Sequence, residues 1–305
     1  MHAQKRKITS VSDSESLSVV HSIPNPRQNI PVRKQTMTAV DTAHTPGRWR
    51  LLYFDAPTRG EQIRLLFKIS GVEFDDVRLE YPRGLEPYKT NTMGDDSPLC
   101  GTDLCPAVTS PDGEHCVETS DIMRLVGRAV GLGPASEADD KRAAAITVRA
   151  QEVLNRSFYK MLLPMVTLNI LSEDLGGVMG YCIPTSFVVK KKKVEEARAE
   201  LDRQATFFED ELISSESGPY FCGDSISYAD VAVFCVLDQA FHFACFNKEE
   251  CLEGRPRLTA WMETMAPKAE PWFKERAEKH QGGHYNIIEA FGALRSPLKW
   301  SRRTK

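Results

Sequence analysis

One stretch, from Trp49 to Leu79, constrains the fold of this chain more than any other. It opens with a short apolar run, WRLLYF, that is suited to a buried strand. After a proline loop, Thr58 and Glu61 have the spacing of a capping box, and Gly71 stands where a left-handed cap would end the helix. Residues 72–79 predict a second strand. The order strand, helix, strand predicts a β-α-β unit.

Turn residues and short apolar runs organise the next segment. Residues 81–102 are rich in proline and glycine and predict a long loop. Two short strands, 107–109 and 115–117, are predicted on either side of the turn signal Pro-Asp-Gly, and together they form a hairpin. Thr119 and Ser120 then open an amphipathic helix that glycines stop after Val130.

Helical periodicity extends nearly throughout residues 137–277 and predicts an all-helical second domain. Within it, Ser227 stands three residues before Asp230, which is an N-capping arrangement, and the helix that follows is apolar on all sides. Such a helix belongs in a core. We therefore expect Ser227 and Asp230 to serve folding and not catalysis.

The two ends of the 305-residue chain differ from its middle. Residues 1–48 contain no aromatic residue other than histidine and are rich in serine, threonine, proline and basic residues, so they cannot bury enough apolar surface to offset ordering entropy. A solvated tail is the favoured interpretation, with an organellar transit peptide as the alternative. The predicted division is 1–48 disordered extension, 49–134 first domain, 135–279 all-helical domain and 280–305 tail.

Net charge and cysteine spacing limit the kinds of binding partner and the cellular compartment that we expect for this chain. The formal net charge of -3 gives no reason to expect nucleic acid, because phosphate binding needs a clustered basic surface. The eight cysteines form no CxxC pair and no secretory signal precedes them, which fits a reducing, cytoplasmic compartment. No apolar run reaches the roughly 20 residues needed to span a bilayer, so we expect no membrane association.

Metal and nucleotide cofactors lack support in the sequence. Cys100, Cys105, His115 and Cys116 are close together along the chain, but their spacing matches no common zinc pattern. No glycine-rich phosphate loop precedes a helix. We predict neither a metal nor a resident cofactor.

Two segments carry a family resemblance. WRLLYFDAPTRGEQIRLLFKISGVEFDDVRL resembles the opening of the sigma-like, tyrosine-using branch of the glutathione S-transferase superfamily, and GPYFCGDSISYADVAVFCVLD resembles its helical-domain signature. The resemblance covers about residues 49–277. It implies an α/β plus all-α fold, in which a thioredoxin-like glutathione-binding domain precedes a C-terminal helical bundle.

The resemblance also assigns candidate site residues. Tyr53 takes the place of the phenol that donates a hydrogen bond to the glutathione sulfur, and Pro106 that of a cis-proline. The full implied glutathione-binding set is Tyr53, Arg59, Lys89, Leu104, Cys105, Pro106, Glu118 and Thr119. Three features depart from the family: Cys105 replaces an aliphatic residue and admits a mixed-disulfide role, Leu85 stands where tryptophan is usual, and residues 89–106 are longer by about one short loop.

Some of these residues have a second interpretation. Thr119 is alternatively a simple N-cap, whereas a helix N-terminus beside an acid is also a natural site for an amino-acid ligand. Electrophile contacts are expected around Phe158, Tyr159 and Leu162, which read equally well as core.

The resemblance implies a glutathione transferase that acts in detoxification. Its co-substrate would be glutathione, its second substrate a hydrophobic electrophile, and its assembly a homodimer. Two alternatives stay open at this point. One is a glutathione-dependent isomerase similar to prostaglandin D synthase, which reuses the same thiolate. The other is a non-catalytic relative that keeps the fold for binding or structure.

Overall fold

The computed structural model describes residues 47–80, 83–158, 184–215, 218–242 and 246–279. The chain divides into two compact units, residues 1–41 and 42–305, and every described residue lies in the second. The predicted C-terminal tail lies outside the described residues, as does the predicted N-terminal extension except for its last two residues, 47 and 48. Within the described part, no helix combines the length and the apolar character that crossing a membrane requires.

A four-stranded sheet forms the N-terminal part of the described chain. Its strands are β1 (Trp49–Phe54), β2 (Phe74–Leu79), β3 (Ala107–Thr109) and β4 (His115–Val117). They lie in the order β2-β1-β3-β4, with β1 and β2 parallel and β3 antiparallel to both of its neighbours. The predicted β-α-β unit and hairpin are confirmed, although β2 begins two residues later than the sequence indicated.

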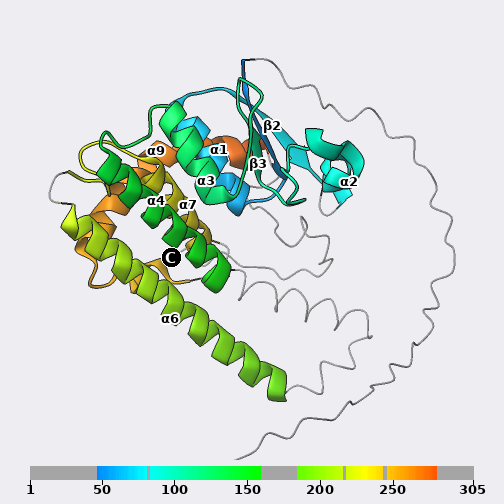
Figure 1. The fold of residues 1–305 in the computed structure, drawn as a ribbon. Coiled ribbons are helices and arrows are strands. Elements are labelled where there is room, and N and C mark those ends of the chain that lie inside the picture. The colour runs from blue at the N-terminus through cyan, green and yellow to red at the C-terminus, as the bar shows by residue number, and fades with distance from the viewer. Residues whose placement is uncertain (1–46, 81–82, 159–183, 216–217, 243–245, 280–305) are drawn as a thin grey trace, which may run out of the picture. The chain divides into compact units, whose positions relative to one another are not determined.

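Helices cover both faces of the sheet (Figure 1). On one face lie α1 (Arg59–Ser70), which ends at the left-handed Gly71 as predicted, and α3 (Thr119–Ala129). Leu51 and Tyr53 point to this face and join its buried core. The other face meets the segment predicted as loop, which contains the short helices η1 (Arg83–Tyr88), α2 (Thr90–Met93) and η2 (Gly94–Asp96).

The rest of the described chain is helical. Its elements are α4 (Glu137–Glu152), the π-helical turn η3 (Val153–Phe158), α6 (Pro184–Ser214), α7 (Tyr228–His242), α8 (Lys248–Leu252) and α9 (Pro256–Lys279). The predicted helical character of this region is confirmed for the described residues, with a non-helical stretch at residues 218–227 before α7. The helix α7 itself is buried along almost its whole length, as its apolar sequence predicted.

Asp230 fixes the start of α7. One carboxylate oxygen accepts hydrogen bonds from the Ser227 backbone N–H at 2.8 Å and from the Ser227 hydroxyl at 2.7 Å. The other accepts from the Phe221 N–H at 3.1 Å and from the Trp261 indole at 2.8 Å. Burial raises the pKa of the Asp230 carboxyl, although these four hydrogen bonds act in the opposite direction. The predicted folding role of Ser227 and Asp230 is therefore confirmed.

Asp140 joins three helices. Its Oδ2 accepts hydrogen bonds from Arg124 at 2.6 Å and from Arg128 at 3.1 Å, both on α3, and its Oδ1 accepts from the Tyr228 hydroxyl of α7 at 2.9 Å. Burial opposes the ionisation of Asp140. The hydrogen bonds from Arg124 and Tyr228, with the charges of both arginines, outweigh burial and hold its pKa below the ordinary value.

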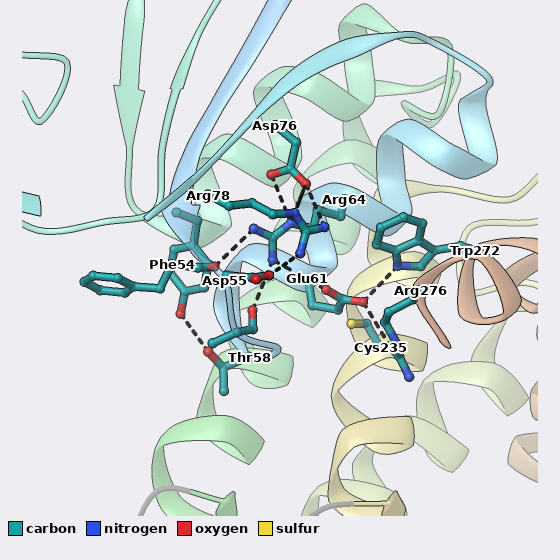
Figure 2. A network of polar contacts seen from close by, with 12 residues as sticks. Phe54, Asp55, Thr58, Glu61, Arg64, Asp76, Arg78, Cys235, Trp272 and Arg276 are labelled. Carbon is teal, nitrogen blue, oxygen red and sulfur yellow. Dashed lines mark hydrogen bonds and ion pairs between the residues drawn. The ribbon is translucent and has the colours of Figure 1, made fainter. Parts of the chain in front are cut away.

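Glu61 does not form the predicted capping box with Thr58, whose side chain caps nothing. The Glu61 carboxylate is fully buried and turns instead toward α9 (Figure 2). One of its oxygens accepts hydrogen bonds from the Trp272 indole at 2.8 Å and from Arg276 at 3.0 Å. An ion pair with this buried acid lowers the cost of burying its charge, so Glu61 ties α1 to the last helix.

Arg64 lies beside Glu61 and is also fully buried. Its Nε donates to both oxygens of Asp76 on β2, at 3.0 and 3.1 Å. Its terminal nitrogens donate to the main-chain carbonyls of Ala56 at 3.0 Å and Phe54 at 3.1 Å (Figure 2). One guanidinium therefore holds α1, β2 and the loop that follows β1 after Phe54.

Replacing Asp140 with Asn should destabilise the fold in a pH-dependent way. A carboxylate whose folded pKa is lowered contributes stability above its unfolded pKa of about 3.9, and this contribution disappears as the pH falls through the folded value. We expect a loss of about 1.5–3 kcal/mol at pH 7, from thermal or urea unfolding, that shrinks as the pH drops below about 4.

Glu137→Gln on the same helix is the matched control, because the Glu137–Lys141 pair is exposed on both sides. It should change stability by less than about 1 kcal/mol. An Asp140→Asn penalty that stays constant from neutral to acidic pH would contradict the assignment.

Arg64→Met should be strongly destabilising. The substitution keeps an apolar side chain of similar length but removes a buried charge that pairs with Glu61 and Asp76 and the guanidinium donors to the two loop carbonyls. Asp76 keeps its ion pair with Arg78, and the Phe54 carbonyl keeps the hydrogen bond from the Ala56 N–H. We expect the free energy of unfolding to fall by about 3–5 kcal/mol, measured by urea denaturation. Arg48→Met is the control, since Arg48 pairs with an 85% exposed Glu73 and should cost less than about 1 kcal/mol. Equal losses in the two variants would refute the role of Arg64.

Candidate active site

Strand register gathers three predicted site residues at one edge of the sheet. Leu52 of β1 pairs with Ala107 of β3, and Ala107 pairs with Val117 of β4. The residues next in line on the three strands are Tyr53, Pro106 and Glu118. Because paired strands hold neighbouring positions side by side, residues far apart in sequence lie together along this edge.

Tyr53 lies at the end of β1 with only 5% of its surface exposed. Its ring packs so closely on α1 that a Cβ atom at Gly60 would clash with it. The Arg64 guanidinium carbon lies 5.8 Å from the ring centroid. The phenolic oxygen is 2.6 Å from the Thr58 hydroxyl oxygen. The ring is therefore part of the core, as the apolar strand predicted, while its hydroxyl has a specific polar neighbour.

Thr58 is a neighbour of Tyr53 that the sequence did not reveal. Its backbone has φ 99° and ψ −129°, a combination that β-branched residues rarely adopt. Its carbonyl accepts hydrogen bonds from Gln239 of α7 at 3.2 Å and from the Glu61 N–H at 3.3 Å. The capping-box spacing suggested a role at the helix start, whereas the observed backbone turns the hydroxyl toward the phenol.

Glu118 and Thr119 form the junction of β4 and α3. Glu118 is exposed and has φ 67°, a conformation uncommon outside glycine. Thr119 is 2% exposed, and its hydroxyl has no hydrogen-bond partner among the described residues. Because buried polar groups are nearly always satisfied, an unpaired hydroxyl at a helix N-terminus is a candidate ligand contact.

The bond between Cys105 and Pro106 is cis, as the resemblance implied. Burial is the main reason that the pKa of the Cys105 thiol rises to about 12, with backbone hydrogen bonds at Phe54 and Cys105 and the charge of Arg59 opposing it. A thiol with this pKa is almost entirely protonated at neutral pH, which counts against the mixed-disulfide role. Leu104, the preceding residue, is 63% exposed.

Arg59 begins α1 and reaches across to the helical region. Its Nη2 donates to the side-chain oxygen of Asn155 at 2.7 Å. Asn155 lies in the π-helical turn η3, an irregularity that often marks a functional position in a helix. Sequence reasoning missed Asn155, since a π-helical turn has no clear pattern in the residues. Phe158 ends the same turn, and Tyr159 and Leu162 lie outside the described residues.

Lys89 stands apart from the other predicted residues. Its ammonium group pairs with Glu86 at 2.7 Å, and no hydrogen bond or ion pair in the described part of the chain joins it to Tyr53, Cys105 or Thr119. Leu85, at the position where the family usually has tryptophan, is buried in η1. The structure does not join Lys89 to the group of Tyr53, Pro106 and Glu118 at the end of the sheet.

Comparisons with known proteins agree with this architecture. The family model described as glutathione S-transferase, C-terminal domain, matches residues 170–268. Glutathione S-transferase P 10 of Caenorhabditis elegans is 29% identical over 217 residues, which cover 71% of this chain and 85% of that protein.

Solved structures show the same fold. The glutathione S-transferase from Ascaris lumbricoides has 24% identity and a TM-score of 0.55, with 75% of this chain and 97% of that chain covered. Monomeric Na-GST-3, a glutathione S-transferase from Necator americanus, has 21% identity, a TM-score of 0.55 and the same coverage. These similarities do not single out the sigma-like branch. The chain is therefore similar to glutathione S-transferases over most of its length and has their fold, a thioredoxin-like part followed by a helical part.

Proposed function

We propose that the protein is a glutathione transferase that joins the glutathione sulfur to electrophilic small molecules. The proposal rests mainly on one observation: strand pairing places Tyr53, Pro106 and Glu118 side by side at one end of the sheet. The curated relative that bears the name glutathione S-transferase adds support.

Three features fit the parts of glutathione. The buried Thr119 hydroxyl and the free N–H groups at the start of α3 suit the γ-glutamyl carboxylate, and the exposed Glu118 suits its ammonium group. The main chain at Cys105, before the cis-proline, suits the cysteinyl part. Arg59 supplies a positive charge for the remaining carboxylate, a role for which Lys89 has less support because it pairs with Glu86.

Tyr53 would activate the sulfur. A free thiol of this kind has a pKa of about 8.5, so only a few per cent is thiolate at neutral pH. A phenolic O–H donated to the sulfur favours the charged form. The thiol proton leaves to solvent, a sulfur electron pair forms the new carbon–sulfur bond, and with an aryl halide the halide departs with the electrons of its bond to carbon.

The division of labour follows the fold. We propose that residues 49–134 form a domain that binds glutathione and that residues 135–279 form a domain that supplies contacts to the electrophile. The homodimer and the sigma-like branch are predictions that the resemblance implies, and the cytoplasmic location is a prediction from cysteine usage.

Tyr53→Phe tests the activation step. The ring still packs on Gly60, so glutathione binding should change by less than about threefold, while loss of a hydrogen bond to a charged sulfur should lower kcat roughly 10- to 100-fold. Steady-state kinetics with an aryl halide acceptor and calorimetric titration with glutathione measure the two quantities. Unchanged turnover in the variant would remove Tyr53 from the mechanism. For the parent protein, recovery of unmodified glutathione together with a rearranged substrate would favour the isomerase.

Thr119→Val tests the binding step separately. The change is close to isosteric and removes the unpaired buried hydroxyl, so the fold should be kept or slightly stabilised. We expect the dissociation constant for glutathione to rise about tenfold or more, because a hydrogen bond to a carboxylate is lost. Thr119→Ser keeps the hydroxyl and should bind nearly as the parent does. Equal affinities in the valine and parent proteins would refute a ligand contact at Thr119.

A further inference from the structure

The hydroxyl of Thr58 is placed to act on the phenol of Tyr53. The two oxygens are 2.6 Å apart, and Thr58 is only 1% exposed. Either group can donate in this hydrogen bond, and each has one proton to give. The chemistry of the pair depends on which of the two donates.

The surroundings of Thr58 decide the direction when a thiolate is bound. Within the described part of the chain, the Tyr53 oxygen is the single hydrogen-bond partner of the Thr58 hydroxyl. If Tyr53 donated to Thr58, the Thr58 proton would be buried without an acceptor there, and the sulfur would receive no phenolic proton. If Thr58 donates to Tyr53, both protons are used, and the Tyr53 proton points to the sulfur.

We propose that Thr58 is a positioning residue that donates its hydrogen bond to the Tyr53 oxygen and so strengthens the donation of Tyr53 to the glutathione thiolate. Successive hydrogen bonds polarise one another, so a phenol that accepts at its oxygen is a better donor through its proton. The inference rests on the proposed function.

The fold holds Thr58 in this position from two directions. Gln239 of α7 donates to its carbonyl at 3.2 Å, and the Glu61 N–H donates to the same oxygen at 3.3 Å. Together they retain a positive φ that a β-branched residue would otherwise leave. On the other side of the pair, close packing against Gly60 fixes the Tyr53 ring. The hydroxyl–phenol contact is therefore a built feature of the loop between β1 and α1.

Replacement of Thr58 by valine is the direct test, because valine keeps the shape and removes the hydroxyl. The readout is the pKa of glutathione bound to the full-length protein, from the ultraviolet absorbance of the thiolate as a function of pH. We expect Thr58→Val to raise this pKa by about half a unit to one unit and to lower kcat/KM at neutral pH by about three- to tenfold. Thr58→Ser, which restores the hydroxyl, should retain the low pKa.

A double-mutant cycle separates action through Tyr53 from a general structural effect. In a Tyr53→Phe background, Thr58→Val should produce no further shift in the bound-thiol pKa, because the group on which Thr58 acts is already gone. Arg64, 5.8 Å from the ring centroid, is the same in every variant, so its charge does not contribute to the differences.

The outcomes distinguish the two proposals. A parent protein that forms no bound thiolate overturns the transferase proposal itself. If the parent lowers the thiol pKa of bound glutathione and Thr58→Val leaves that pKa unchanged, only the role of Thr58 is overturned. The same conclusion follows if Thr58→Ser raises this pKa as much as Thr58→Val does. If the valine variant fails to fold, the serine variant and Thr58→Ala in the same cycle give the same test.

Discussion

The buried guanidinium of Arg64 is the contact on which the rest of the site depends. The chain must turn sharply after Tyr53 to start α1, and this turn leaves the carbonyls of Phe54 and Ala56 directed into the interior. Buried carbonyls need donors, and Arg64 donates to both of them, beside the Ala56 N–H that also reaches the Phe54 carbonyl, while Asp76 on β2 balances the Arg64 charge. The position of the phenol is thus set by a charge in the second turn of the helix that follows it.

Neutralisation of this charge links distant parts of the chain. Glu61 lies against Arg64 at 3.6 Å and also receives Trp272 and Arg276 from α9. A fully buried acid with a single cation would be a poor arrangement, because desolvation costs can exceed one Coulombic contact. Shared between two arginines and an indole, the same carboxylate becomes a joint between α1 and the C-terminal helical region.

Local patterns in the sequence predicted what local physics decides. The apolar run of β1, the left-handed Gly71 and the Ser227–Asp230 start of α7 are each determined by a few neighbouring residues, and each appears in the structure. The role of Glu61 could not be predicted in this way, because its partner Trp272 is 211 residues distant. Its spacing from Thr58 is equally consistent with a capping box. The choice between the two depends on where α9 packs.

Helix α1 has little freedom left for changes in specificity. Glu61, Gln62 and Arg64 are all buried and each is committed to another element: Glu61 to α9, Gln62 to α4 through a reciprocal amide pair with Gln151, and Arg64 to β2. Arg59, which is only partly buried, is different because it meets Asn155 on the surface of η3. A π-helical turn can be lengthened or relaxed without unpacking α1. Variation in the second substrate is therefore best accommodated on the η3 side of the site, while the sheet edge that would bind glutathione stays fixed.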